Sequence, residues 1–277
     1  MLDPLLKRLT PLLEDVPGVV AVVLGGSRAR GTAGSASDYD IGLYYGPDAP
    51  LDTDRLLQVV KGLVDDPVAA AVTPVGAWGQ WIVGGGWLSI GGRKVDLLYR
   101  STDAVARVIQ ACRTGSITMD YQPGHPHGFC SAIWMGEVAL CRPIHDPKSV
   151  IAGLKATTSP YPEPLREAIV HRFQWEVLFS IENGEIAVSR REQTHIAGCA
   201  CRALCCIGQV LFACNRRYLI NEKGALYEAA SFPITIAGLL ERVAGVWGMI
   251  GGGEFSEAFV ELRALEQELA AVADTGG

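Results

Sequence analysis

Three aspartates in the N-terminal half of the chain have the types and spacing that a metal-dependent reaction needs. Asp38 and Asp40 are two residues apart in an extended run, so both carboxylates project from the same face of a strand. Asp96 lies in a later run, between the apolar residues Val95 and Leu97. Carboxylates on one pleat repel each other unless a cation lies between them, and oxygen ligands of this kind suit magnesium. The pattern therefore predicts a magnesium site in which all three aspartates are candidate ligands and candidate catalytic residues.

The elements that must position these carboxylates are strands and one tight turn. The apolar, β-branched run over 18–24 predicts a buried strand that ends abruptly at a Gly-Gly-Ser turn. A second strand is expected over 38–45, and two glycines between alternating segments predict a hairpin over 87–99. The turn after the first strand offers backbone amides and a hydroxyl, which is the ordinary way to hold an anion such as phosphate.

The pattern of the chain changes near residue 155. Before it, strand patterns alternate with short helical patterns such as 52–64, and the stretch 115–148 is rich in prolines and reads as loops. After it, helical periodicity dominates, and four helices are expected: 165–182, 189–215, 234–248 and 254–272. The sequence thus predicts an α+β domain over 1–155, followed by an α-helical bundle domain over 156–277.

The turn and the aspartates also carry a family resemblance. The pattern Leu24-Gly25-Gly26-Ser27, a ten-residue spacer, then Asp38-Tyr39-Asp40-Ile41 resembles the G-S, spacer, D-x-D signature of the DNA-polymerase-β-like nucleotidyltransferase superfamily. Asp96 is similar to the third carboxylate of that family, and the resemblance covers about residues 15–110. Because a helical bundle follows, the chain resembles the aminoglycoside-adenylyltransferase type, including the streptomycin and spectinomycin class. The resemblance implies a polymerase-β-like mixed sheet with flanking helices.

The resemblance also implies roles for individual residues. Asp38 and Asp40 would ligate two magnesium ions, and Asp96 would bind one metal, act as the base on an acceptor hydroxyl, or do both. Lys223, which follows the long apolar helix, is similar to a lysine that reaches the triphosphate, although a solvated loop lysine would look the same. Three further residues would contact the triphosphate: Gly26, Ser27 and Ser37.

Candidates for acceptor binding are spread over both halves of the chain. His125 and His127 lie in a proline–glycine segment, for which an ordered loop beside the acceptor, a plain surface loop and a metal site are all considered. Trp175, Glu176 and His195 are expected on helices that line a ligand cleft. Three tryptophans are expected to fill the packing of the sheet rather than to stack on a base: Trp78, Trp81 and Trp87.

The combined interpretation is a nucleotidyltransferase. It would move a nucleoside monophosphate, with AMP from ATP favoured, to a hydroxyl of a small molecule, aminoglycoside-like by analogy and hence of the antibiotic-resistance kind. Two alternatives stay open: an antitoxin-type nucleotidyltransferase that modifies or masks a protein partner, and a nucleotide-binding module without turnover. A nucleic-acid acceptor is disfavoured because the net charge is −6.

The cysteines and apolar runs bear on the cellular compartment. Five of the eight cysteines fall within the apolar run 196–214, where they are expected to pack as small buried side chains. The run contains Arg202 and Gln209 and is expected to be a core helix rather than a membrane span. The first residues lack the pattern of a signal peptide. A reducing, cytoplasmic location is expected, and the oligomeric state is left open.

Overall fold

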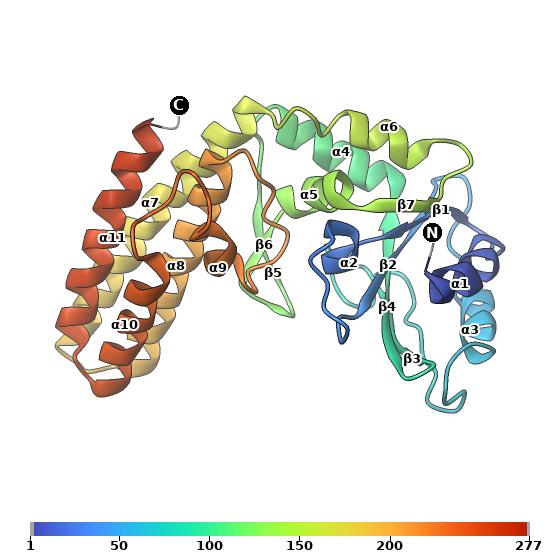
Figure 1. Cartoon of the computed structure of the whole chain (residues 1–277), viewed down its shortest axis with the longest axis horizontal. Helices are drawn as coiled ribbons and strands as arrows, with labels where there is room; N and C mark the ends of the chain where they lie inside the picture. Colours follow the sequence, from blue (N-terminus) through green and yellow to red (C-terminus); the bar gives the residue numbers. More distant parts are fainter. Residues whose placement is uncertain (1–2, 276–277) are drawn as a thin grey trace. The chain divides into compact units, whose positions relative to one another are not determined.

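A computed structural model describes residues 3–275 of the chain (Figure 1). The chain divides into two compact units, of which the first comprises Met1–Gln110 with Asp120–Pro160 and the second Ala111–Met119 with Tyr161–Gly277. The division into domains over 1–155 and 156–277 stays a prediction.

The first unit is built on a five-stranded mixed sheet with the order β3-β4-β2-β1-β7. The β2–β4 pair is parallel, and the other neighbouring pairs are antiparallel. The predicted strands and hairpin are present, with these bounds: β1 (Val19–Leu24), β2 (Tyr39–Tyr45), β3 (Gly85–Ile90), β4 (Arg93–Ser101) and β7 (Arg142–His145).

One face of this sheet forms the core of the first unit. The helices α1 (Pro4–Glu14) and α3 (Thr53–Lys61) pack on it through leucines and valines, and one cluster unites them with alternate residues of β2, β3 and β4. Alternation along a strand sends the remaining side chains to the opposite face, so the buried pattern of β2 decides where its acidic residue points.

The opposite face of the sheet is met by shorter elements. The helix α2 (Gly26–Arg30) contacts β2, α5 (Ala132–Leu140) contacts α2, and α6 (Val150–Ala156) contacts β1. The helix α4 (Thr102–Arg113) follows β4, with the Ser101 hydroxyl accepting a hydrogen bond from the amide of Ala104 at 3.4 Å.

The stretch 115–148 is more regular than its sequence predicts. It contains a two-stranded sheet, β5 (Met119–Gln122) with β6 (His125–Cys130), and the almost fully buried helix α5. Prolines at 123 and 126 hide the strand pattern, because proline is tolerated in a two-stranded sheet whose edges are unpaired. The expectation of a loop at His125 and His127 is therefore wrong, since both lie in β6.

The second unit is helical, as predicted. Its long helices α7 (Glu163–Val188) and α8 (Gln193–Cys214) pack side by side, and α9 (Ala225–Ala229), α10 (Leu239–Gly252) and α11 (Phe255–Thr275) complete it (Figure 1). Gly184 allows α11 to approach α7, because a Cβ at this position would lie 2.0 Å from Cζ of Phe259.

The helix α8 passes a test of length and hydropathy for a membrane span, yet 67% of its most apolar window is buried inside the protein. This burial is typical of the core helix of a soluble protein. All eight cysteines are free thiols, and the packing prediction holds for Cys206 and Cys214, which are buried. Three others in α8 are only half-buried: Cys199, Cys201 and Cys205.

Candidate active site

The parallel pairing of β2 with β4 aligns two of the three predicted aspartates. Asp40 and Asp96 are register partners, so their side chains lie side by side on the face of the sheet opposite the core. The alternate residues Ile41 and Leu97 are buried in that core. The sequence pattern predicted Asp38 within the strand, but β2 begins at Tyr39, so Asp38 lies just before it. No purely local pattern specifies this alignment, because it depends on the register of two strands far apart in the sequence.

The Gly-Ser turn after β1 lies directly against Asp40. The amide of Gly25 donates to the main-chain carbonyl of Asp40 at 2.8 Å. Gly26 has φ +58°, and a Cβ there would come within 1.8 Å of Oδ2 of Asp40. Only glycine fits this close approach. The structure therefore brings together the turn predicted to hold phosphate and an aspartate predicted to hold metal.

The electrostatic surroundings of Asp40 disfavour a bare carboxylate. Burial raises the pKa of Asp40 above its ordinary value, and the negative charges of Asp38 and Glu137 raise it further, while Arg28 and Arg30 oppose the shift. Glu137 is itself held by Arg100, whose Nε and Nη2 each donate to one carboxylate oxygen at 2.9 Å. A bound cation would relieve the repulsion between the carboxylates.

The donor set fits a magnesium ion that shares its coordination with a substrate. Among the side chains of residues 3–273, no three His, Cys, Asp or Glu are close enough to form a protein-only metal site. Magnesium does not need such a cage, because it is usually held by one or two carboxylates together with water and substrate phosphates. Asp38 and Asp40 would supply the carboxylates for such an ion, and the neighbouring turn would supply amides for the phosphates.

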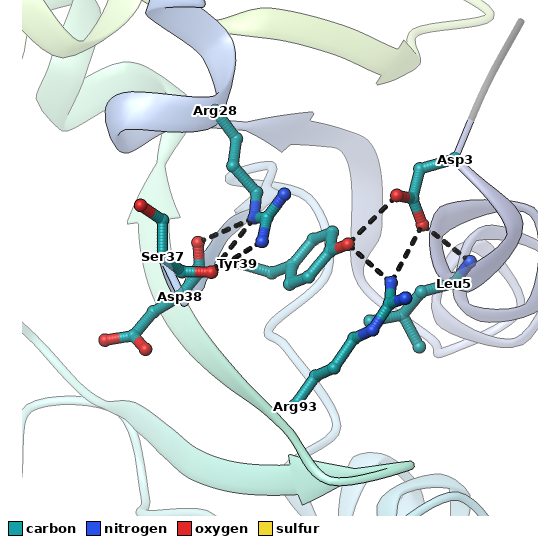
Figure 2. Close-up of polar contacts among 7 residues, drawn as sticks. All are labelled: Asp3, Leu5, Arg28, Ser37, Asp38, Tyr39 and Arg93. Carbon is teal, nitrogen blue, oxygen red and sulfur yellow. Dashed lines mark hydrogen bonds and ion pairs between the residues drawn. The ribbon is translucent and has the colours of Figure 1, made fainter. Parts of the chain in front are cut away.

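Arg28, which the sequence analysis did not single out, fixes the segment that carries Asp38 (Figure 2). Its Nε donates to the carbonyl oxygens of Ser37 and Asp38, both at 3.1 Å, and its Nη2 donates to that of Ser37 at 2.6 Å. The guanidinium also lies 3.8 Å from the centroid of the Tyr39 ring. An arginine directly after Gly-Ser is the sequence signal that could have pointed to this role.

Tyr39 continues this network to the N-terminal helix (Figure 2). Its hydroxyl donates to Oδ2 of Asp3 at 2.9 Å and accepts from Nη1 of Arg93 at 2.8 Å. Burial would raise the pKa of Asp3, but hydrogen bonds from the Leu5 amide and from Tyr39, together with Arg93, hold it below its ordinary value. The start of β2 is thus held through its main chain by Arg28 and through the Tyr39 hydroxyl by Asp3 and Arg93.

The other predicted phosphate contacts have ordinary local surroundings. The Ser37 hydroxyl accepts from the amide of Gly34 at 3.0 Å, and Ser27 lies in the first turn of α2. Lys223 lies in the second unit, where its amide donates to Oδ1 of Asn221 at 2.8 Å. Its role in triphosphate binding stays a prediction.

The predicted acceptor residues of the second unit lie on or beside a charged cluster. Glu176 is buried in α7 and is bound by Arg172, whose Nε is 3.1 Å from Oε1, and by Arg202. Trp175, by contrast, is 60% exposed and stacks on Phe179. His195 lines a cavity of about 860 Å³ between α7 and α8, whose lining also includes these residues: Phe179, Asn183, Cys199 and Arg202.

The aromatic residues of the first unit differ from one another. Trp81 is 5% exposed and packs on Phe129, as predicted. His127 is buried, and His125 packs edge-on against Phe129. Trp87 is 73% exposed, so the prediction that it fills the packing of the sheet is wrong.

Comparison with known proteins agrees with the site. The nucleotidyltransferase domain family matches residues 6–110. No curated protein matches the sequence. Among solved structures, a nucleotidyltransferase-like protein from Exiguobacterium sibiricum 255-15 matches with 10% identity and a TM-score of 0.42, over 98% of this chain and 76% of that chain. The matched segment contains the Gly-Ser turn and all three aspartates, so residues 6–110 form a nucleotidyltransferase domain of the polymerase-β-like superfamily.

Proposed function

We propose that the protein transfers a nucleoside monophosphate, AMP from ATP in the favoured form, to a hydroxyl of a small-molecule acceptor. The observation that carries this proposal is the pairing of Asp40 with Asp96 in neighbouring strands, with the Gly26 turn against Asp40. Asp40, beside the phosphate turn, is placed to serve the nucleotide donor. Asp96, one strand further away, is placed to serve the acceptor hydroxyl. An aminoglycoside-like acceptor is proposed by analogy with the family type.

Each residue of the site has a defined task in this reaction. The turn at Gly26 and Ser27, together with Ser37, binds the triphosphate. Lys223 remains a proposed triphosphate contact. Asp38 and Asp40 hold two magnesium ions, which when bound neutralise the charge on the phosphates and on the departing pyrophosphate. Arg28 keeps the backbone of Asp38 in place.

Asp96 acts on the acceptor. As the acceptor oxygen forms its bond to the α-phosphorus, the bond from that phosphorus to the bridging oxygen breaks, and pyrophosphate leaves with the electron pair. The hydroxyl proton passes to Asp96, which is the general base of the proposal. His125, His127, Trp175, Glu176 and His195 remain proposed acceptor contacts.

The experiment that tests this function measures nucleotide binding and turnover together. Thermal unfolding is followed with each of the four nucleoside triphosphates, with magnesium and with a chelator, and pyrophosphate release is recorded. At 100 times its Kd, a bound nucleotide stabilises the protein by about 2.7 kcal/mol. We expect ATP to stabilise the protein only when magnesium is present. Equal stabilisation in the chelator would contradict the metal-dependent site, and binding without pyrophosphate release under any acceptor would favour the module without turnover.

The remaining proposals concern the setting of the reaction. Eight free thiols fit a reducing compartment, and we propose the cytoplasm. An antitoxin-type activity on a protein partner is the competing function. Copurification of a stoichiometric small protein that loses its activity when bound or modified would favour that alternative.

A further inference from the structure

An exposed tryptophan lies beside the proposed base. Trp87 and Asp96 are register partners in the antiparallel β3–β4 pair, so their side chains lie next to each other on the same face of the sheet. The next residue, Leu88, pairs with Val95 on the opposite, buried face. Trp87 leaves 73% of its surface in solvent although it is the largest apolar side chain of its strand.

The order of the strands places Trp87 on the side of Asp96 that faces away from the phosphate turn. Along the sequence of strands β1, β2, β4 and β3 lie, in turn, the Gly26 turn, Asp40, Asp96 and Trp87. In an in-line displacement the attacking hydroxyl approaches from the side opposite the leaving group. Because the phosphate turn is at the β1 side, the acceptor belongs on the β3 side, where Trp87 is an exposed aromatic residue.

The Trp87 ring is held in place rather than left mobile. Trp78 stacks on it with ring centroids 4.5 Å apart and an interplanar angle of 18°. Trp78 in turn lies over Gly85, where an added Cβ would come within 2.9 Å of Cζ3 of the indole. The same Cβ would come within 1.8 Å of the main-chain carbonyl oxygen of Leu97, so glycine at position 85 allows the close approach of both β4 and the Trp78 ring. We call the stacked pair the Trp78–Trp87 platform.

A buried glutamine fixes the loop that carries Trp78. Gln122 in β5 is 2% exposed, and its Nε2 donates to the carbonyl of Trp78 at 2.9 Å. Its Oε1 accepts from the amides of Trp81 and Ile82 at 3.2 and 3.3 Å. Three hydrogen bonds from one buried side chain restrict this loop, so the platform is ordered before a ligand arrives, which lowers the entropic cost of binding.

We propose that the Trp78–Trp87 platform binds the acceptor and selects a hydroxylated ring, such as a saccharide or cyclitol. The flat face of C–H groups on such a ring would lie on the indole of Trp87, and a hydroxyl at the ring edge would reach Asp96. Burial of the exposed indole supplies the affinity, and the neighbouring carboxylate supplies the orientation. The carboxylates disfavour a phosphate-rich acceptor such as a nucleic acid. This inference rests on the proposed function, because it takes Asp96 as the base.

The test compares ring and chain polyols as probes. Binding of myo-inositol, methyl α-glucopyranoside and the acyclic polyol sorbitol is measured by saturation-transfer NMR, and Mg-ATP-dependent pyrophosphate release is recorded with each. The variants are Trp87→Ala, Trp87→Phe and the control Trp247→Ala, which removes a tryptophan that is 39% exposed in α10. Because Trp87 is exposed, its substitution should leave the fold intact.

We expect the ring probes, but not sorbitol, to bind the wild-type protein. Trp87→Ala should raise the Kd or KM of a ring probe about tenfold, which is a change of about 1.4 kcal/mol, without changing the affinity for Mg-ATP. Trp87→Phe should recover most of the loss, since it keeps a flat apolar face, and Trp247→Ala should match the wild type.

Three results would overturn the platform: no ring probe binds, sorbitol binds as well as the rings, or Trp87→Ala weakens Mg-ATP and leaves the ring probes unaffected. The last result would assign the indole to the donor base. Failure of the proposed function looks different, because Mg-ATP would then not bind the wild-type protein. The NMR measurement still tests the platform in that event, since it does not require turnover.

Discussion

Asp40 in the first unit is half-buried and Glu176 in the second is buried, yet the charges around the two carboxylates differ. Glu176 is bound by Arg172 and Arg202, so its charge is compensated by the protein itself. Asp40 lies among Asp38 and Glu137, and its pKa is raised above the ordinary value. The difference separates a carboxylate whose charge the protein itself compensates from one whose full compensation must come from a ligand.

This contrast has a physical basis in the cost of burying charge. A buried carboxylate is stable when cations and hydrogen-bond donors replace its lost water, and each unmet need costs free energy. The helical unit meets this need within two neighbouring helices. At Asp40 the charges of Arg28 and Arg30 meet it only in part, because the pKa stays raised. An incompletely compensated carboxylate beside a glycine turn and a second aspartate is typical of a site built for a charged ligand.

The largest expected effect comes from Asp96. Asp96→Asn keeps the shape of the side chain but removes the proposed base, so nucleotidyl transfer should fall at least about 100-fold, while Mg-ATP still binds. Transfer rates with a working acceptor and thermal shifts with Mg-ATP check the two parts. Asp48→Asn, a change in an exposed loop, is the control. Near-normal turnover of Asp96→Asn would make this aspartate structural.

Substitution of Glu176 should lower stability, whereas substitution of Asp96 should lower turnover. Glu176→Gln removes the charge that compensates two arginines, so the free energy of unfolding should fall by roughly 2 kcal/mol. The matched control is Glu185→Gln, whose partner Arg263 is partly exposed, and its loss should stay below about 1 kcal/mol. Denaturant unfolding of both variants measures the difference. If the two variants lose the same stability, the two arginines do not stabilise the folded protein through Glu176.

A smaller effect is expected from Arg28. Arg28→Ala removes three hydrogen bonds to the carbonyls before β2, so Asp38 should lose its fixed position. The magnesium concentration for half-maximal activity should then rise about tenfold, which corresponds to roughly 1.4 kcal/mol. Arg28→Lys should not restore it, because lysine lacks the planar fork. Arg55→Ala, at an exposed arginine of α3, is the control. A loss of stability with an unchanged magnesium dependence would assign Arg28 to folding alone.

The smallest effect concerns pH without metal. The pKa of Asp40 is raised in the folded protein, so between the ordinary value of 3.8 and the raised value the folded state binds more protons than the unfolded state. Stability therefore falls as the pH rises through this window, and the penalty persists above it. In chelator, Asp40→Asn should lack this fall. Identical pH profiles for the wild type and the variant would show that Asp40 is already compensated.

The local elements of this protein follow from its sequence. The alternation of β2 and the two glycines of the β3–β4 turn predict strands because side chains of an extended chain alternate in direction. The β5–β6 pair escaped prediction, because its prolines mimic a loop. Arg28 escaped too, since its partners are main-chain carbonyls about ten residues away, and no side-chain pattern reports such contacts.

The sequence by itself determined the family of the first domain, the acidic and glycine-rich character of its site and the helical nature of the second unit. Only the tertiary structure decided that Asp40 and Asp96 are neighbours, that Gly26 touches Asp40 and that Trp87 is exposed beside Asp96. The reason is that periodicity tells which face a residue takes within one strand, whereas strand order and register arise from packing between distant segments. A shift of one residue in the β2–β4 or β3–β4 register would move Asp96 away from Asp40 or from Trp87.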